Sequence, residues 1–228
     1  MDPDYNDMFT NKKSIIMKNY FLSLFQGYTD LHPTNTTLDE LAERIRTDER
    51  LKDITENHRS YLKLNQTRAA GRMKAACPCF AVAVRFEGGK RKEHIGGWTH
   101  LVMADFDHIP TERMAECIRR VREDRHTLLA YITISGEGLR VIAAYEAADD
   151  YHPRSEQELH VLAFGQMNGH YAQLVQLPYD EKCKNATRLS GLAYDPEAYY
   201  EPAATPFVIA KPRPEEHPAR QKAQRMKL

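Results

Sequence analysis

The stretch Leu101–Asp107, LVMADFD, is an apolar run that ends in two aspartates separated by one residue. Residues two apart in a β-strand point to the same face, so a strand here would project both carboxylates from one side of a sheet. Two like charges this close need a counter-ion, and Mg²⁺ or Mn²⁺ binds carboxylate oxygens and bridges to substrate phosphates. The stretch therefore predicts a metal site on Asp105 and Asp107. The alternative is that the pair only ends the strand and caps the helix that begins near Pro110.

Regular elements are expected on both sides of this strand, and their order indicates the fold class. Strands are expected at about residues 99–106, 127–134, 139–145 and 187–194, and helices at about residues 111–123 and 153–175. The order β-α-β-β-α-β is that of the ferredoxin-like or RRM-like core, an antiparallel sheet with both helices on one face. The opposite face is then free for function. Because this topology carries many unrelated activities, the fold class alone does not decide among them.

An extension of strands and helices precedes that core. Residues 17–28 are rich in aromatic and apolar side chains and predict a strand. Thr37 and Glu40 have capping-box spacing, so a helix is expected at residues 38–47. A second helix at about residues 51–64 and a hairpin over about residues 75–95 complete the extension.

These elements divide an α+β protein into four parts. The parts are an N-terminal tail (1–16), a strand, helix and hairpin extension (17–98), the RRM-like core (99–200) and a Pro-rich, basic C-terminal tail or linker (201–228). With 42% hydrophobic and 28% charged residues among 228, the chain has the composition of a folded domain with a sizeable core. We therefore expect one domain with a sizeable core, or a core domain with an appended segment.

The charges give only a local indication of a partner. Lys and Arg number 32, as do Asp and Glu, so the total does not indicate a polyanion. Residues 68–93 nevertheless carry seven basic side chains and only two acids, Glu87 and Glu93, which fits either a solvated hairpin surface or a phosphate-facing one. The N-terminus lacks the pattern of a secretory signal, and no apolar run approaches membrane-helix length, so we expect a cytoplasmic location with reduced cysteines and no membrane partner.

A glycine-containing turn is the second candidate motif. Ser135, Gly136 and Gly138 lie between two expected strands, and Arg140 follows at the start of the second strand. Glycines let the backbone approach an anion, a serine hydroxyl can donate to it, and an arginine can make a forked phosphate contact. Two glycines are also what an ordinary tight hairpin turn uses, so both interpretations remain open.

The third candidate motif combines an acid and an arginine at the last expected strand. Asp180 precedes the strand and Arg188 lies on it. Two-metal chemistry usually draws on more than two acids, so Asp180 could be a third carboxylate, and Arg188 could hold a triphosphate. Asp195, before Pro196, is a competing acid. Residues of an ordinary surface loop would look similar.

The three motifs in this order resemble the N-terminal domain of virulence-associated protein E-type replication proteins of bacterial mobile elements, a branch of the archaeo-eukaryotic primase superfamily. The resemblance runs from about Phe21 to about Tyr200. Its motifs are MADFDH (103–108), SGEGLR (135–140) and DEKCKNATRLSGLAYDP (180–196). Many members of the superfamily have Ser-x-His at the second motif, whereas this branch has a Ser-Gly form, so only Ser135 corresponds and no histidine does.

The resemblance implies a primase-polymerase-like nucleotidyltransferase. Asp105, Asp107 and Asp180 would bind Mg²⁺ or Mn²⁺, Ser135 and Arg188 would contact the nucleotide, and Lys74 and Arg140 would contact phosphate or template. The partners would be a single-stranded DNA template, nucleoside triphosphates and a replicative helicase, fused or separate. The alternative is a catalytically inactive RRM-like domain that binds nucleic acid and acts with such a helicase.

Overall fold

The LVMADFD stretch forms β6 (Leu101–Phe106), a fully buried strand of the computed structural model, which describes residues 19–210. β6 pairs antiparallel along its whole length with β8 (Leu139–Ala147), and this register places Asp105 opposite Arg140. The other strands of this core sheet are β7 (Leu129–Ile132), which also pairs with β8, β10 (Tyr199–Tyr200), which pairs with β7, and β11 (Phe207–Ile209), which runs parallel to the end of β8.

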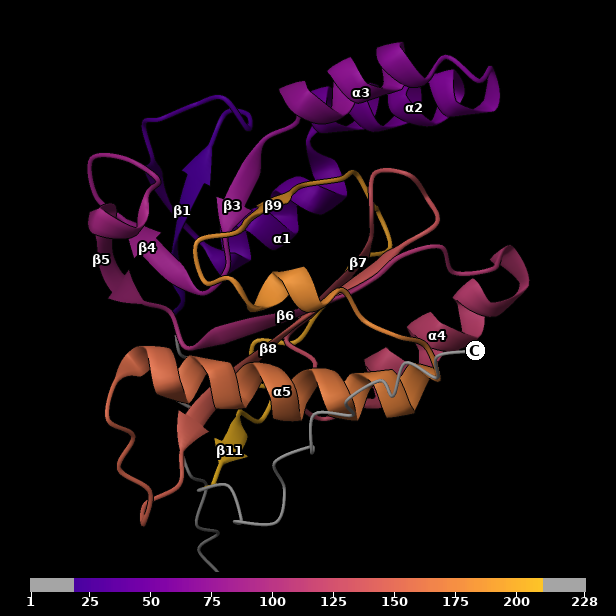
Figure 1. Ribbon diagram of the computed structural model, residues 1–228. Coiled ribbons are helices and arrows are strands. Elements are labelled where there is room, and N and C mark those ends of the chain that lie inside the picture. Colours follow the sequence, from indigo (N-terminus) through magenta and orange to yellow (C-terminus); the bar gives the residue numbers. More distant parts are fainter. Residues whose placement is uncertain (1–18, 211–228) are drawn as a thin grey trace, which may run out of the picture.

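Two helices cover one face of the core sheet, as the sequence predicted. α4 (Thr111–Glu123) and α5 (Glu156–Val175) pack against each other and against this sheet, and Figure 1 shows both on the same side of it. Met103 and Asp105 of β6 face a cavity on the opposite side. Because side chains alternate along a strand, the residues between them point toward the helices, which explains why the whole strand is buried.

A second antiparallel sheet of four strands lies beside the core sheet. Its order is β2 (Thr34–Thr37), β1 (Phe21–Phe25), β3 (Cys79–Ala81) and β9 (Leu189–Gly191), and the neighbouring hairpin consists of β4 (Val84–Phe86) and β5 (Ile95–Trp98). All pairings in this sheet are antiparallel. The structure is therefore an α+β fold of three open sheets.

β9 differs from the sequence-based expectation that it completes the core sheet. It pairs with β3, where Ser190 lies opposite Phe80. The free edge of β6 is instead approached by the 3₁₀ turn η2 (Glu181–Lys184), since the amide of Asp180 donates to the carbonyl of Asp105 at 2.9 Å. The chain thus crosses from the edge of one sheet into the other, and the expected fourth core strand belongs to the second sheet.

Three helices link the strands of the second sheet. They are α1 (Leu38–Thr47), α2 (Glu49–Lys63) and α3 (Thr67–Ala76), of which α2 and α3 form a hairpin that stands at one end of the molecule (Figure 1). The buried ring of His58 donates from Nδ1 to the carbonyl of Ala70 at 2.8 Å and fastens α3 to α2. The sequence did not predict α3, because its segment buries only Ala70 and so shows no apolar stripe.

The expected C-terminal tail begins later than residue 201. β11 lies within it, and the ring of Phe207 stacks on that of His126 with centroids 4.0 Å apart. The sequence did not predict β11, because the segment is rich in proline and the strand pairs through only three residues. The expected N-terminal tail (1–16) and residues 211–228 lie outside the described residues. Between residues 19 and 210, no helix is long and apolar enough to cross a membrane.

The capping box of α1 provides a test of local stability. The amide of Glu40 donates to Thr37 Oγ1 at 3.3 Å, and the amide of Thr37 donates to the Glu40 carboxylate at 3.0 Å. We expect Thr37→Ala to lower the free energy of unfolding by about 1 kcal/mol, because an N-cap acceptor is lost. Chemical denaturation measures this change. Thr47→Ala, at the other end of the same helix, is the control, and an equal loss from it would contradict a capping role.

Candidate functional site

A cavity of about 670 Å³ lies on the helix-free face of the core sheet. Its walls come from β6, β8 and the turn after β7 on one side and from β9, α3, the loop after β1 and the β4–β5 loop on the other. The predicted residues that line it are Lys74, Asp105, Asp107, Ser135, Arg140 and Arg188. Residues from all three sequence motifs are therefore brought to one cavity, whereas Asp180, Gly136 and Gly138 do not line it.

Asp105 and Arg140 form a buried ion pair across β6 and β8. Arg140 Nη2 lies 2.8 Å from Asp105 Oδ2, and the side chains are 12% and 6% exposed, respectively. Burial opposes the charge of Arg140, but Asp105 and the hydroxyl of Tyr131 favour it, and the pKa of Arg140 lies well above its usual value. Arg140 Nη1 also donates to Tyr131 Oη at 3.1 Å and to the carbonyl of Gly191 at 2.8 Å.

The acid pair satisfies part of what a divalent cation needs. Asp105 lines the cavity, and its buried Oδ1 has no hydrogen-bond partner among residues 19–210, so one carboxylate oxygen remains unpaired. Asp107, just past the end of β6, is exposed and lines the same cavity. Two carboxylates completed by substrate phosphates are a usual Mg²⁺ environment. The donor set therefore fits a cation held by Asp105 and Asp107.

The structure does not bring a third acid to this pair. Asp180 Oδ1 accepts from the amide of Lys182 at 2.9 Å, and Asp180 Oδ2 accepts from Arg188 at 3.0 Å, so its side chain caps η2. Asp195 does not line the cavity either, and its carboxylate accepts from the amides of Ile132 and Glu197. No cluster of three potential metal ligands occurs in the described part of the chain. Of the three predicted ligands, the structure thus brings Asp105 and Asp107 to the cavity and leaves Asp180 outside its lining.

The glycine turn owes its shape to contacts within the fold. Gly136 has a φ of +82°, which favours glycine, and a Cβ on Gly138 would lie 2.5 Å from Thr133 Oγ1. Ser135 Oγ accepts from the amide of Glu137 at 3.2 Å. Arg59 of α2 donates to the carbonyls of Thr133 and Ile134 at 3.3 and 3.2 Å. The two glycines therefore fix the turn, and of its residues predicted to bind a ligand only Ser135 reaches the cavity wall.

Several cavity residues belong to no sequence motif. Tyr28 lines the cavity, and burial raises the pKa of its hydroxyl to about 12, although Arg140 opposes that shift. Lys90 Nζ donates to the carbonyls of Tyr28 and Asp30 at 2.5 and 2.8 Å and so holds the loop that carries Tyr28. The basic run of residues 68–93 was the only sequence signal for Lys90 and its neighbour Arg91, and no motif signalled Tyr28.

The cavity carries more positive than negative charge, although the chain is neutral. Five basic side chains line it, Lys74, Lys90, Arg91, Arg140 and Arg188, together with two acids, Asp105 and Asp107. Arg140 and Arg188 are neutralised by Asp105 and Asp180, whereas Lys74 and Arg91 have no salt-bridge partner among residues 19–210. A walled space with this charge surplus favours a polyanionic ligand such as a polyphosphate.

The buried ion pair allows a stability test. Arg140→Met leaves Asp105 charged and buried without its cation, and we expect it to lower the free energy of unfolding by about 3 kcal/mol or more. Adding Asp105→Leu should recover part of this loss, because no buried charge then remains. Arg119→Met, which breaks exposed pairs with glutamates, should cost less than about 1 kcal/mol. Denaturant unfolding of the three variants measures these changes in the free energy of unfolding. Equal losses from Arg140→Met and Arg119→Met would contradict a buried ion pair between Asp105 and Arg140.

Comparison with known proteins places the chain in a family. No curated protein and no solved structure matches it. The family model described as BT4734-like, N-terminal domain, matches residues 72–200, which is more than half of the chain and includes β6, β8, β9 and both helices of the core. From this match, the chain belongs to the BT4734-like N-terminal domain family.

Proposed function

We propose that this domain is a metal-dependent nucleotidyltransferase of the primase-polymerase type, acting on a single-stranded DNA template. The observation that carries the proposal is the placement of Asp105 and Asp107 with Lys74, Ser135, Arg140 and Arg188 around one positively charged cavity. By the resemblance to the archaeo-eukaryotic primase superfamily, Asp105, Asp107, Ser135 and Arg188 correspond to motif residues, and Lys74 and Arg140 would contact phosphate or template. The family description itself names no activity.

The size and chemistry of the cavity support a nucleoside triphosphate as ligand. A volume of about 670 Å³ lies within the range of small-molecule sites. Mg²⁺ or Mn²⁺ bound by Asp105 and Asp107 would neutralise phosphate charge and lower the barrier to attack by a 3′-hydroxyl, with pyrophosphate leaving. Arg140 holds Asp105 in place, and Lys74 and Arg91 are available for phosphate oxygens.

The arrangement of the core sheet also supports this proposal. An RRM-like core has four strands and two helices on one face. Three of its strands correspond in order to β6, β8 and β7, and its helices correspond to α4 and α5. We infer that the domain is RRM-like, with its fourth strand moved into the neighbouring sheet. That displacement gives the active-site cavity a second wall, formed by β9 and α3.

A non-catalytic role is the second candidate, and the ion pair favours it. Arg140 occupies one oxygen of Asp105, and Arg188 occupies one oxygen of Asp180. An acid neutralised by an arginine attracts a cation less strongly than a free one. On this alternative, the domain binds nucleic acid without transferring nucleotides and acts with a helicase. Measurements of metal binding and of nucleotide incorporation distinguish the transferase from the binding domain.

The central test is nucleotide incorporation on a single-stranded template, with and without a primer, in Mg²⁺ or Mn²⁺. We expect wild-type protein to incorporate nucleotides, and Asp105→Asn and Asp107→Asn to lose at least about 100-fold in rate, because stabilisation of transition-state charge is lost. Manganese binding, followed by electron paramagnetic resonance, should weaken in the same two variants.

Asp149→Asn is the matched control for this test, since Asp149 is an exposed acid in the turn after β8, outside the cavity. It should incorporate nucleotides and bind Mn²⁺ as wild type does. Wild-type protein that binds Mn²⁺ and template but incorporates nothing would refute the transferase and favour the binding domain. Incorporation that is unchanged in both cavity variants would refute the assigned metal site.

Asp180 is tested separately, because its side chain points to η2 and not to the cavity. Asp180→Asn keeps an oxygen for the cap, and its backbone bond to Asp105 does not depend on the side chain. We therefore expect Mn²⁺ affinity to be unchanged in this variant. Calorimetric titration with Mn²⁺ measures it. A loss as large as that of Asp107→Asn would restore Asp180 as a third ligand.

A further inference from the structure

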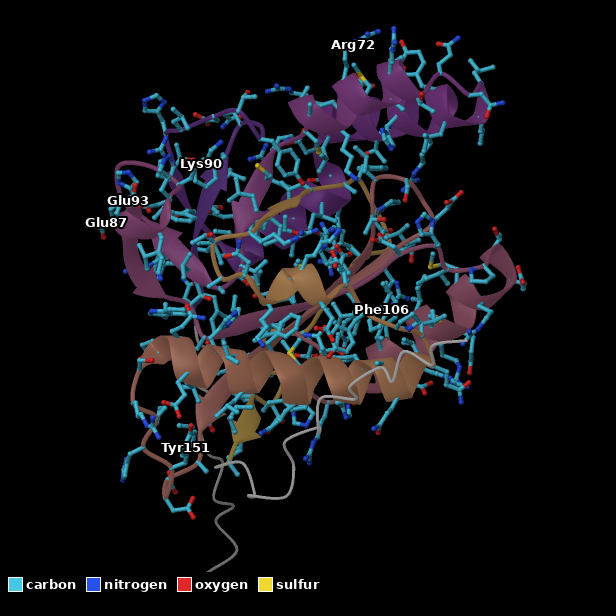
Figure 2. All side chains as sticks on the ribbon, in the orientation of Figure 1. Arg72, Glu87, Lys90, Glu93, Phe106 and Tyr151 are labelled. Carbon is cyan, nitrogen blue, oxygen red and sulfur yellow. The ribbon has the colours of Figure 1, made fainter. Side chains whose placement is uncertain are left out.

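The basic run of residues 68–93 is split by the fold into two surfaces of different character. One part lies on α3, which carries Arg68, Arg72 and Lys74 and no acidic residue. The other part lies on the β4–β5 hairpin, where Glu87 and Glu93 are exposed beside the basic side chains. Figure 2 shows these two acids at the outer edge of the hairpin. In the same view, Arg72 lies on the outer side of α3, at the top of the molecule. Of these two surfaces, α3 therefore carries positive charge without any acid, whereas the hairpin mixes basic and acidic side chains.

The outer surface of α3 is open to a ligand. Only Ala70 of this helix is buried, and its contact is with α2. Arg68 and Arg72 are exposed and lie four residues apart, so they share one face of the helix. No described residue forms a salt bridge with either arginine. Two neighbouring arginines thus face solvent without an acid to neutralise them.

A path of small residues joins these arginines to the cavity. Around the helix, at 3.6 residues per turn, Gly71 and Ala75 fall between the side of Lys74 and the side of Arg68 and Arg72. Both small residues are exposed, and a Cβ added to Gly71 would meet nothing within 4 Å. Lys74 lines the cavity. A flexible chain lying across Gly71 and Ala75 can therefore contact the two arginines and Lys74 at once.

We propose that α3 is the template-binding element, on which a single DNA strand crosses over Gly71 and Ala75. Its phosphates contact Arg68 and Arg72 on the outer side of the helix and Lys74 at the edge of the cavity. The strand thereby passes from an exposed basic surface to the space where the nucleotide is held. This assignment rests on the proposed function, because it is the transferase reaction that makes the partner a template strand.

The charge of α3 favours a single strand over other partners. Arginines bind phosphate through a planar fork, and a backbone-directed contact needs no base sequence. A single strand is flexible enough to bend around a helix of ten residues and enter a cavity, whereas a duplex is stiff over such lengths. Duplex binding equal to single-strand binding is accordingly an outcome that contradicts the proposal.

Fluorescence anisotropy of a labelled oligonucleotide, measured over a series of salt concentrations, tests this surface. Arg68→Gln/Arg72→Gln should weaken single-strand binding and reduce the slope of log affinity against log salt by about 1.4, since each lost phosphate contact removes about 0.7. Arg119→Gln/Arg154→Gln removes the same charge from exposed positions on and next to the core helices and should leave the slope unchanged. Equal slopes for the two variants, or no binding by wild type, would overturn the proposal.

A second variant separates the path across α3 from charge alone. Gly71→Gln adds bulk where the strand would cross, keeps the net charge and introduces a better helix former into an open position. We expect the melting temperature to be retained or raised while single-strand affinity falls severalfold. Unchanged affinity in a folded Gly71→Gln variant would show that the strand does not cross there.

Incorporation assays keep this proposal distinct from the proposed function. Neither Arg68, Arg72 nor Gly71 lines the cavity, so Mn²⁺ binding should be unchanged in these variants. If wild-type protein incorporates nucleotides and the α3 variants bind template as well as wild type does, the role of α3 is overturned and the transferase assignment stands. Binding that depends on α3 without any incorporation by wild type would instead refute the transferase and leave the surface in place.

Discussion

The ion pair between Asp105 and Arg140 is the interaction on which the geometry of the cavity depends. It joins β6 to β8 at the register position where the two residues face each other, and Arg140 also reaches Tyr131 on β7 and the carbonyl of Gly191 on β9. Buried charges are tolerated only when they are paired and hydrogen-bonded. One guanidinium group therefore ties three core strands to a strand of the second sheet.

This constraint explains why β9 lies across the open face of the core sheet. A buried arginine with donors on that face needs acceptors in addition to Asp105, and the backbone of β9 supplies one. Had β9 joined the edge of β6, as the β-α-β-β-α-β order predicted, its carbonyl would not lie over Arg140. The displacement of this strand and the burial of Arg140 are thus two aspects of one arrangement, and together they build the second wall of the cavity.

Sequence patterns predicted the elements whose signals are local and missed those that depend on distant partners. α4 was predicted at its observed bounds, and the capping box located α1, because caps and helical periodicity are encoded within a few residues. The pairing of β9 with β3 joins residues more than 100 positions apart and has no local signal. At the site, motif residues on β6 and β8 were found, whereas Tyr28 and Arg59 come from the extension and carry no motif.

The local charges also show why total charge is a poor guide to the partner of this chain. Equal numbers of acidic and basic residues give no net charge, yet the fold gathers five basic side chains around the cavity and leaves α3 without an acid. Many of the compensating acids lie elsewhere, as in the exposed pairs of α4, where Glu116 and Glu123 contact Arg119. Fields at a surface fall off within about a Debye length, roughly 8 Å at physiological salt, so these distant acids do little to reduce attraction at the cavity. A polyanion approaching α3 therefore experiences a basic protein, while one approaching α4 does not.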